Sequence, residues 1–328
     1  MKSYRSKVPV SVAVIAVIAS LLLATGCGSE PGTANDAPPD KDFVARISVV
    51  GEISGESDRY TSSDDSYHHD WTKKTIDNLV KNERNKGLLI YVDSPGGAVY
   101  ESDELYLKIM EYKEKTGRPV YVYMGPMAAS GGYYISAGAD KIYANRNTWT
   151  GSIGVISGTY FDVSGFLAKH GIKATDVTSG RNKGMGGYFE PMTDEQRAII
   201  QSIVDESYGQ FVSIVADGRG MDVEIVKQVA DGRIYTAKQA KGAGLIDDVL
   251  TEVEAIEAVK AEMGDSGIAV SDIRFVPADD IFGLGGADPF SIFGFGKAGG
   301  RDDGGDISRV LDLATSDGRV PLKYLYRG

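Results

Sequence analysis

The sequence has little cysteine and little histidine: Cys27 is its only cysteine, and it has three histidines among 328 residues. A single cysteine excludes disulfides within the chain, so the fold must depend on its hydrophobic core. Two of the histidines, His68 and His69, lie in a polar stretch without apolar periodicity. No spacing of histidine, cysteine or carboxylate side chains indicates a metal site, and no cofactor is expected.

Positive charge is also scarce, because 35 lysines and arginines face 46 aspartates and glutamates and leave a net charge of −11. No basic run of five or more residues occurs in the body of the chain. Nucleic acid is therefore excluded as an expected partner, since its phosphates would be repelled. Hydrophobic residues make up 42% of the sequence, enough to bury the core of one large domain or two smaller ones.

A long hydrophobic run occurs at the N-terminus, from Val8 to Ala24, after three basic residues. This order is typical of an export signal. The run ends in Ala24-Thr25-Gly26-Cys27, which resembles the lipobox of bacterial lipoproteins and implies a diacyl lipid on Cys27. An uncleaved anchor helix and simple secretion are the alternatives, and 17 residues is near the short limit for spanning a bilayer. All three place the folded part on the extracytoplasmic side, on or near the membrane.

Composition divides the chain into five segments. We expect a lipoprotein-type signal peptide or anchor at 1–26, a flexible tether at 27–42, a folded domain at 43–277, a glycine-rich linker at 278–306 and a C-terminal tail at 307–328. Nine glycines between Gly283 and Gly305 indicate the linker. The tail is apolar and aromatic again from Val320 to Tyr326, which a merely solvated segment would not need.

Apolar β-rich runs alternate with helical patterns from residue 43 onward, which predicts an α/β fold with a parallel or mixed sheet. The expected strands cover 44–50, 88–92, 120–124, 141–144 and 153–156. The expected helices are one that ends at Gly87, one between Gly97 and Gly117, a short one opened by Ser130, one over 166–170, one from Thr193 to Gly218, and a pair over 223–230 and 236–243. Gln196 completes a capping box for the helix that starts at Thr193.

Ser130 lies among small residues in Met127-Ala128-Ala129-Ser130-Gly131-Gly132 at a predicted strand-to-helix junction, where it could act as a nucleophile. A serine hydroxyl needs a base within hydrogen-bond reach. His170, oriented by Asp176, is one candidate, although a histidine at a helix end before a glycine has an ordinary structural explanation. Lys183, in a glycine-rich loop, is the other, and it can serve only if burial leaves part of it neutral.

Three stretches together resemble the signal peptide peptidase A family, the Ser-Lys dyad serine proteases of peptidase family S49. They are Asp93-Ser94-Pro95-Gly96-Gly97, Met127 to Tyr134, and Thr150-Gly151-Ser152-Ile153-Gly154, and both their order and their spacing agree. The resemblance covers about residues 44 to 250. It implies a fold of ββα spiral repeats of the crotonase and Clp protease kind, and the serine block occurs once, as in the single-repeat members.

The resemblance also implies roles for individual residues. Ser130 matches the nucleophile, and Lys183, 53 residues later, matches the general base. Ser152 matches the serine that hydrogen-bonds the lysine. Gly97 matches the glycine whose backbone N–H forms the oxyanion hole with that of Ser130, and a residue without a side chain suits such a close approach.

The partners implied by the resemblance are peptides, the membrane and further copies of the chain. Cleaved signal peptides and other unfolded apolar segments would be the substrates. A homo-octamer is expected, in which the lysine of one subunit reaches the serine of its neighbour. The tail could enter the substrate groove in extended form as a self-cleaved or inhibitory segment. A non-proteolytic membrane scaffold and a crotonase-like acyl-CoA enzyme are the alternative functions, although export argues against the second.

Overall fold

The computed structural model describes residues 41–55, 67–274 and 323–325. Its strands are β1 (Phe43–Val50), β2 (Asn85–Ser94), β3 (Gly96–Ala98), β4 (Val120–Ala129), β5 (Lys141–Ala144), β6 (Trp149–Gly151), β7 (Ile234–Thr236), β8 (Asp248–Val249), β9 (Ala269–Ile273) and β10 (Lys323–Leu325). Its helices are α2 (His69–Lys81), α3 (Val99–Thr116), α4 (Gly131–Ser136), α5 (Ser164–Lys169), α6 (Asp194–Arg219), α7 (Val223–Val229), α8 (Ala237–Gly242) and α9 (Glu252–Glu262). The expected signal or anchor, Cys27, the linker and most of the tail lie outside the described residues.

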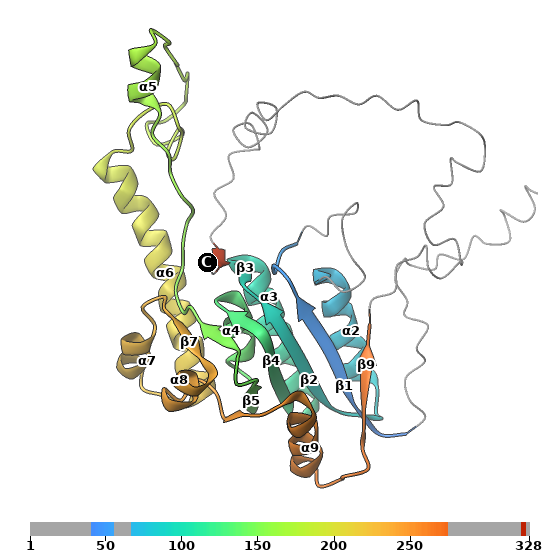
Figure 1. The fold of residues 1–328 in the computed structure, drawn as a ribbon. Helices are drawn as coiled ribbons and strands as arrows, with labels where there is room; N and C mark the ends of the chain where they lie inside the picture. The colour runs from blue at the N-terminus through green and yellow to red at the C-terminus, as the bar shows by residue number, and fades with distance from the viewer. Residues whose placement is uncertain (1–40, 56–66, 275–322, 326–328) are drawn as a thin grey trace, which may run out of the picture.

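The main sheet is mostly parallel and follows the order β7-β6-β4-β2-β1-β9, with β5 paired to β4 and β8 paired to β5. Only β7 runs antiparallel to its neighbour, β6. Helices α2, α3 and α4 cover one face, and α9 packs on the other (Figure 1). The predicted α/β fold is confirmed, and β2, β3 and α3 form one of the expected ββα units. No helix in the described ranges is long and apolar enough to cross a membrane.

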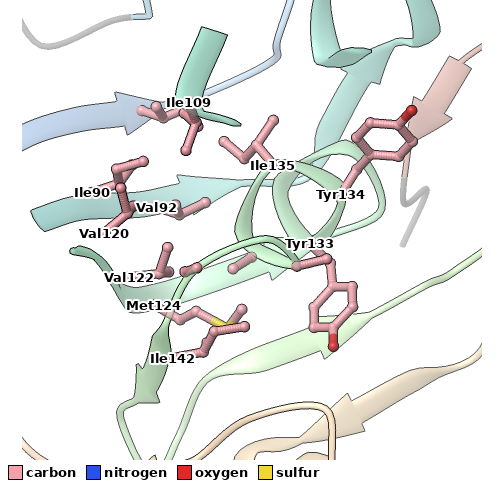
Figure 2. Close-up of a cluster of buried hydrophobic side chains, with 14 of the residues drawn as sticks. Ile90, Val92, Ile109, Val120, Val122, Met124, Tyr133, Tyr134, Ile135 and Ile142 are labelled. Atoms are coloured by element: carbon pink, nitrogen blue, oxygen red, sulfur yellow. The ribbon is translucent and has the colours of Figure 1, made fainter. Parts of the chain in front are cut away.

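The core beneath the sheet is built from alternate residues of the central strands. Figure 2 shows side chains of β2, β4 and β5 meeting those of α3 and α4 in one cluster. Val92, Val122 and Tyr133 in this cluster are fully buried. The two central strands are parallel and covered on both faces, which explains their nearly continuous apolar sequence. The core therefore holds the carboxyl ends of β2 and β4 rigidly side by side.

Two predicted element boundaries were wrong. Helix α2 ends at Lys81, not at Gly87, and Gly87 lies inside β2, where an added Cβ would come 3.3 Å from the Pro119 carbonyl oxygen. The strand expected at 153–156 is replaced by β6 over Trp149–Gly151. The capping box of α6 is confirmed, because the side chains of Thr193 and Gln196 each accept a hydrogen bond from the other's backbone N–H.

His69 is buried despite its polar sequence neighbourhood, and so is the preceding His68. Its Nδ1 lies 2.5 Å from the Tyr67 hydroxyl and its Nε2 lies 2.8 Å from Oε2 of Glu104. The Lys73 ammonium donates to the same carboxylate at 2.8 Å. The hydrogen bonds from His69 and Lys73 hold the pKa of Glu104 at about 2. This network joins the start of α2 to α3.

Candidate active site

Ser130 occupies a sharp junction between the end of β4 and the start of α4. Its backbone has φ 54° and ψ −115°, a region that residues with side chains rarely adopt. Two backbone hydrogen bonds hold this conformation, because the Ser130 N–H donates to the Gly151 carbonyl at 2.8 Å and the Tyr134 N–H donates to the Ser130 carbonyl at 2.8 Å. Such strain persists only where surrounding packing enforces it, and it is common at active sites.

Helix α4 anchors Ser130 because every residue of the helix is buried. The Tyr133 hydroxyl donates to the Leu245 carbonyl at 2.8 Å, and the Tyr134 hydroxyl donates to Asp103 Oδ1 at 2.6 Å. Burial raises the pKa of Tyr133, so its hydroxyl stays protonated and keeps this donor role. The two aromatic rings extend from opposite sides of the short helix (Figure 2). The nucleophile candidate is thus attached to one of the best-packed parts of the fold.

Gly97 lies in β3 at a position where any side chain would clash with the backbone of Ile53. A Cβ added there would come 1.9 Å from the Ile53 carbonyl oxygen. Ile53 forms a parallel bridge with Gly97, and its N–H donates to the Gly96 carbonyl at 2.8 Å. Gly96 has φ 102°, which glycine tolerates without strain. The glycines predicted to form a tight turn therefore bring a backbone edge close to Ser130.

Gly131 is the residue whose backbone approaches Gly97. A Cβ on Gly131 would lie 3.1 Å from the Gly97 nitrogen and 3.2 Å from the Gly96 Cα. The amide of Ser130 was expected to be the second oxyanion donor, but it is engaged by the Gly151 carbonyl. The amide of Gly131, at the first position of α4, therefore fits that place better. Sequence reasoning missed this residue, although a glycine directly after the nucleophile was the available signal.

Ser152 follows β6, and β6 pairs in parallel with the end of β4, so that Ala129 faces Gly151. The second and third motifs are therefore adjacent through the sheet. Ser152 has φ 51° and is 7% exposed, and its N–H donates to the Arg233 carbonyl at 2.8 Å. Its place beside Ser130 is consistent with a contact to the general base, which was expected from the resemblance.

Lys183 lies on a long segment that projects from the body of the molecule and carries α5 (Figure 1). No residue from 154 to 210 is buried, and Lys183 itself is exposed. His170 and Asp176, the alternative base and its orienting carboxylate, are exposed on the same segment. In the described chain no hydrogen bond or ion pair joins any of them to Ser130. The described part of one chain thus brings none of the predicted base residues to Ser130.

The projecting segment exposes large apolar side chains. They are Phe161 (63% exposed), Phe166 (63%), Ile172 (53%), Val177 (97%) and Phe189 (47%). An open groove of about 650 Å³ lies at the base of this segment, beside Ser152. Its lining comes from the residues after β6, from α6 and from the turn before β7, and includes Ile156, Val204, Asp205 and Tyr208.

Strand β10 lies against β3 in antiparallel orientation, with Tyr324 opposite Gly97. It also lies next to α3 and α4 (Figure 1). Ile53 pairs with β3 as well, through a parallel bridge to Gly97. The edge of β3 beside Ser130 therefore accepts an extended peptide segment. In the parts of the chain that the structure describes, no group of three or more histidine, cysteine or carboxylate side chains could hold a metal ion.

Comparisons with known proteins place the sequence in a family. The sequence profile of Peptidase family S49 matches residues 112–265. A protein named putative signal peptide peptidase SppA from Enterococcus faecium is 39% identical over 220 residues, which cover 67% of this chain and 63% of that protein. A putative protease from Synechocystis sp. is 39% identical over 215 residues, which cover 65% of this chain and 71% of the relative. The match spans less than two thirds of the Enterococcus protein.

Among solved structures, a ClpP1 mutant from Listeria monocytogenes matches part of the chain. It aligns with a TM-score of 0.42 and 16% identity, covering 64% of this chain and 94% of that one. A membrane-bound stomatin-specific protease mutant aligns with a TM-score of 0.44 and 15% identity, covering 73% of this chain and all of the other. The sequence relatives carry the assignment: the chain belongs to peptidase family S49, a family of serine proteases.

Proposed function

We propose that this chain is an endopeptidase that binds peptides in extended form along β3 and attacks them with Ser130. One observation carries the proposal. A strained, buried serine lies beside a glycine edge that already pairs with an extended segment of the chain. Peptide recognition by strand addition uses backbone hydrogen bonds, which suits substrates of varied sequence.

The reaction begins when the Ser130 hydroxyl attacks the peptide carbonyl and forms a tetrahedral intermediate. The amides of Gly97 and Gly131 donate hydrogen bonds to its oxyanion, and the start of α4 adds a favourable dipole. The general base takes the serine proton and passes it to the leaving amine. A water activated by the same base then hydrolyses the acyl-enzyme.

Lys183 of a neighbouring copy is the proposed base. Its segment has no buried residue and exposes apolar side chains, as expected for a surface that another subunit covers. The groove beside Ser152 offers a place for the incoming lysine. Burial in that groove would disfavour the charged ammonium and leave part of the lysine neutral. A closed homo-oligomer, an octamer by family resemblance, would complete every site.

The proposed substrates are cleaved signal peptides and other unfolded apolar peptides at the extracytoplasmic face of the membrane. The Enterococcus relative is named as a signal peptide peptidase, which supports this substrate class. An N-terminal anchor, by a lipid on Cys27 or by a retained helix, would keep the site near the bilayer where such peptides are released.

The test uses the full-length protein, purified in detergent, with an unstructured apolar fluorogenic peptide. We expect hydrolysis, together with labelling of Ser130 by a fluorophosphonate probe, located by mass spectrometry of the digested protein. The Ser130→Ala variant should lose both, whereas Ser136→Ala, which changes another buried serine on α4, should keep both. Hydrolysis by Ser130→Ala at the wild-type rate would overturn the proposal.

Removal of residues 320–328 is expected to raise kcat/KM for the peptide by about tenfold, because an intramolecular segment competes with substrate at a high effective concentration. Tyr324→Pro retains the chain length but removes one backbone donor, and it should give a smaller increase in the same direction. Both variants are compared with wild type by steady-state kinetics at equal protein concentration. Unchanged or lower kcat/KM in the truncated chain would show that β10 does not block the site.

A further inference from the structure

Ser102 is a fully buried serine in the first turn of α3. Its hydroxyl makes no hydrogen bond among the described residues. A buried hydroxyl without a partner costs stability, and native proteins retain few of them. An alanine would fill nearly the same space without that cost. The unpaired hydroxyl therefore calls for a functional explanation.

The position of the hydroxyl supplies that explanation. The Oγ atom of Ser102 lies 2.6 Å from the point where a Cβ on Gly131 would stand, and the same point is 3.1 Å from the Gly97 nitrogen. The hydroxyl thus lies close to the backbone of Gly131 and Gly97, the two residues whose amides are proposed to bind the oxyanion. Helix α3 begins at Val99, two residues after Gly97. Strand β3, which contains Gly97, therefore continues directly into the helix that carries Ser102.

Neighbouring buried serines behave differently. The Ser136 hydroxyl donates to the Gly132 carbonyl at 2.7 Å, and the Ser94 hydroxyl accepts from the Gly96 N–H at 3.1 Å. Both of these hydroxyl groups hold local backbone in place. Among these three serines of the described chain, only Ser102 has a hydroxyl without a protein partner.

We propose that Ser102 is a catalytic residue whose hydroxyl donates a third hydrogen bond to the oxyanion, beside the amides of Gly97 and Gly131. The inference rests on the proposed reaction at Ser130. The hydroxyl keeps its proton throughout and takes part in no covalent step. Its unpaired state before the reaction is useful, because the new hydrogen bond forms only as negative charge develops on the carbonyl oxygen.

The decisive variant is Ser102→Ala in the full-length protein, assayed with the fluorogenic peptide. We expect kcat to fall about 10- to 100-fold with little change in KM, since the lost hydrogen bond belongs to the transition state. Inhibition by a peptide aldehyde, which forms a tetrahedral adduct with the nucleophile, should weaken by a similar factor. The melting temperature should stay the same or rise, because an unpaired hydroxyl is removed.

Ser136→Ala is the matched control, with the opposite pattern: a lower melting temperature and nearly wild-type kcat. Ser102→Cys, which retains a weak donor of similar size, should have an intermediate kcat and serves as the second variant if Ser102→Ala does not fold. Wild-type kcat in Ser102→Ala, or in a folded Ser102→Cys, would overturn the assignment of Ser102. Fluorophosphonate labelling of Ser130 in the wild type separates that outcome from a failure of the proposed function, in which no labelling occurs.

Discussion

Mixing Ser130→Ala subunits with Lys183→Ala subunits is expected to restore peptide hydrolysis that neither variant has alone. Each single variant should lose about a thousandfold or more in kcat, because nucleophile and base act as a unit. In the structure Lys183 is exposed on the projecting segment, and the proposal is that it reaches Ser130 of another copy. A mixed assembly then contains some sites with both groups intact.

The size of the recovery follows from the geometry of a ring. When the two variants are mixed equally and assemble at random, about one site in four joins an intact serine to an intact lysine across a head-to-tail interface. Recovery to about a quarter of wild-type activity is therefore expected after subunits are dissociated and reassembled together. Lys173→Ala, which alters another exposed lysine on the same segment, is the control and should keep full activity. No recovery would mean that serine and lysine act within one chain.

Gly97→Ala is expected to reduce kcat by about a hundredfold or more, since it displaces the backbone N–H proposed to bind the oxyanion. The added methyl would come 1.9 Å from the Ile53 carbonyl oxygen, so either the bridge to residue 53 or β3 itself must shift. Overpacking of this kind should also lower the free energy of unfolding by about 1–3 kcal/mol. Steady-state kinetics and thermal unfolding of the same preparation measure the two effects.

A second glycine provides the control for this variant. Gly209 lies in the interior of α6 with no atom within 4 Å of an added Cβ. Gly209→Ala should therefore stabilise the protein by about 0.5–1 kcal/mol and leave kcat unchanged. If Gly97→Ala retained wild-type kcat, the oxyanion would not be bound at β3.

Local sequence signals predicted the elements that depend on local chemistry. The capping box at Thr193 and the helix end at Gly117 are both confirmed, because each is decided by hydrogen bonds within a few residues. Gly87 misled the prediction, since a glycine also suits a strand where the Pro119 carbonyl approaches closely. Only the tertiary fold distinguishes these two uses of glycine.

The sequence predicted the residue types of the candidate site better than it predicted which backbone N–H groups are free to bind an oxyanion. The small residues around Ser130 and the glycines at 96 and 97 indicated an oxyanion turn. The engagement of the Ser130 amide by the Gly151 carbonyl depends on the pairing of β4 with β6, which no local pattern contains. The unpaired hydroxyl of Ser102 also becomes visible only once α3 is packed against α4.

The projecting segment between β6 and the buried half of α6 has a consequence for control of the enzyme. It has no buried residue, so it draws almost no stability from the core and should open easily in a lone subunit. If Lys183 acts from this segment on a neighbour, a newly made chain is harmless while it is dilute. Proteolysis then begins only where the local concentration of copies is high. Association of subunits would activate this protease, as cleavage of a propeptide activates others.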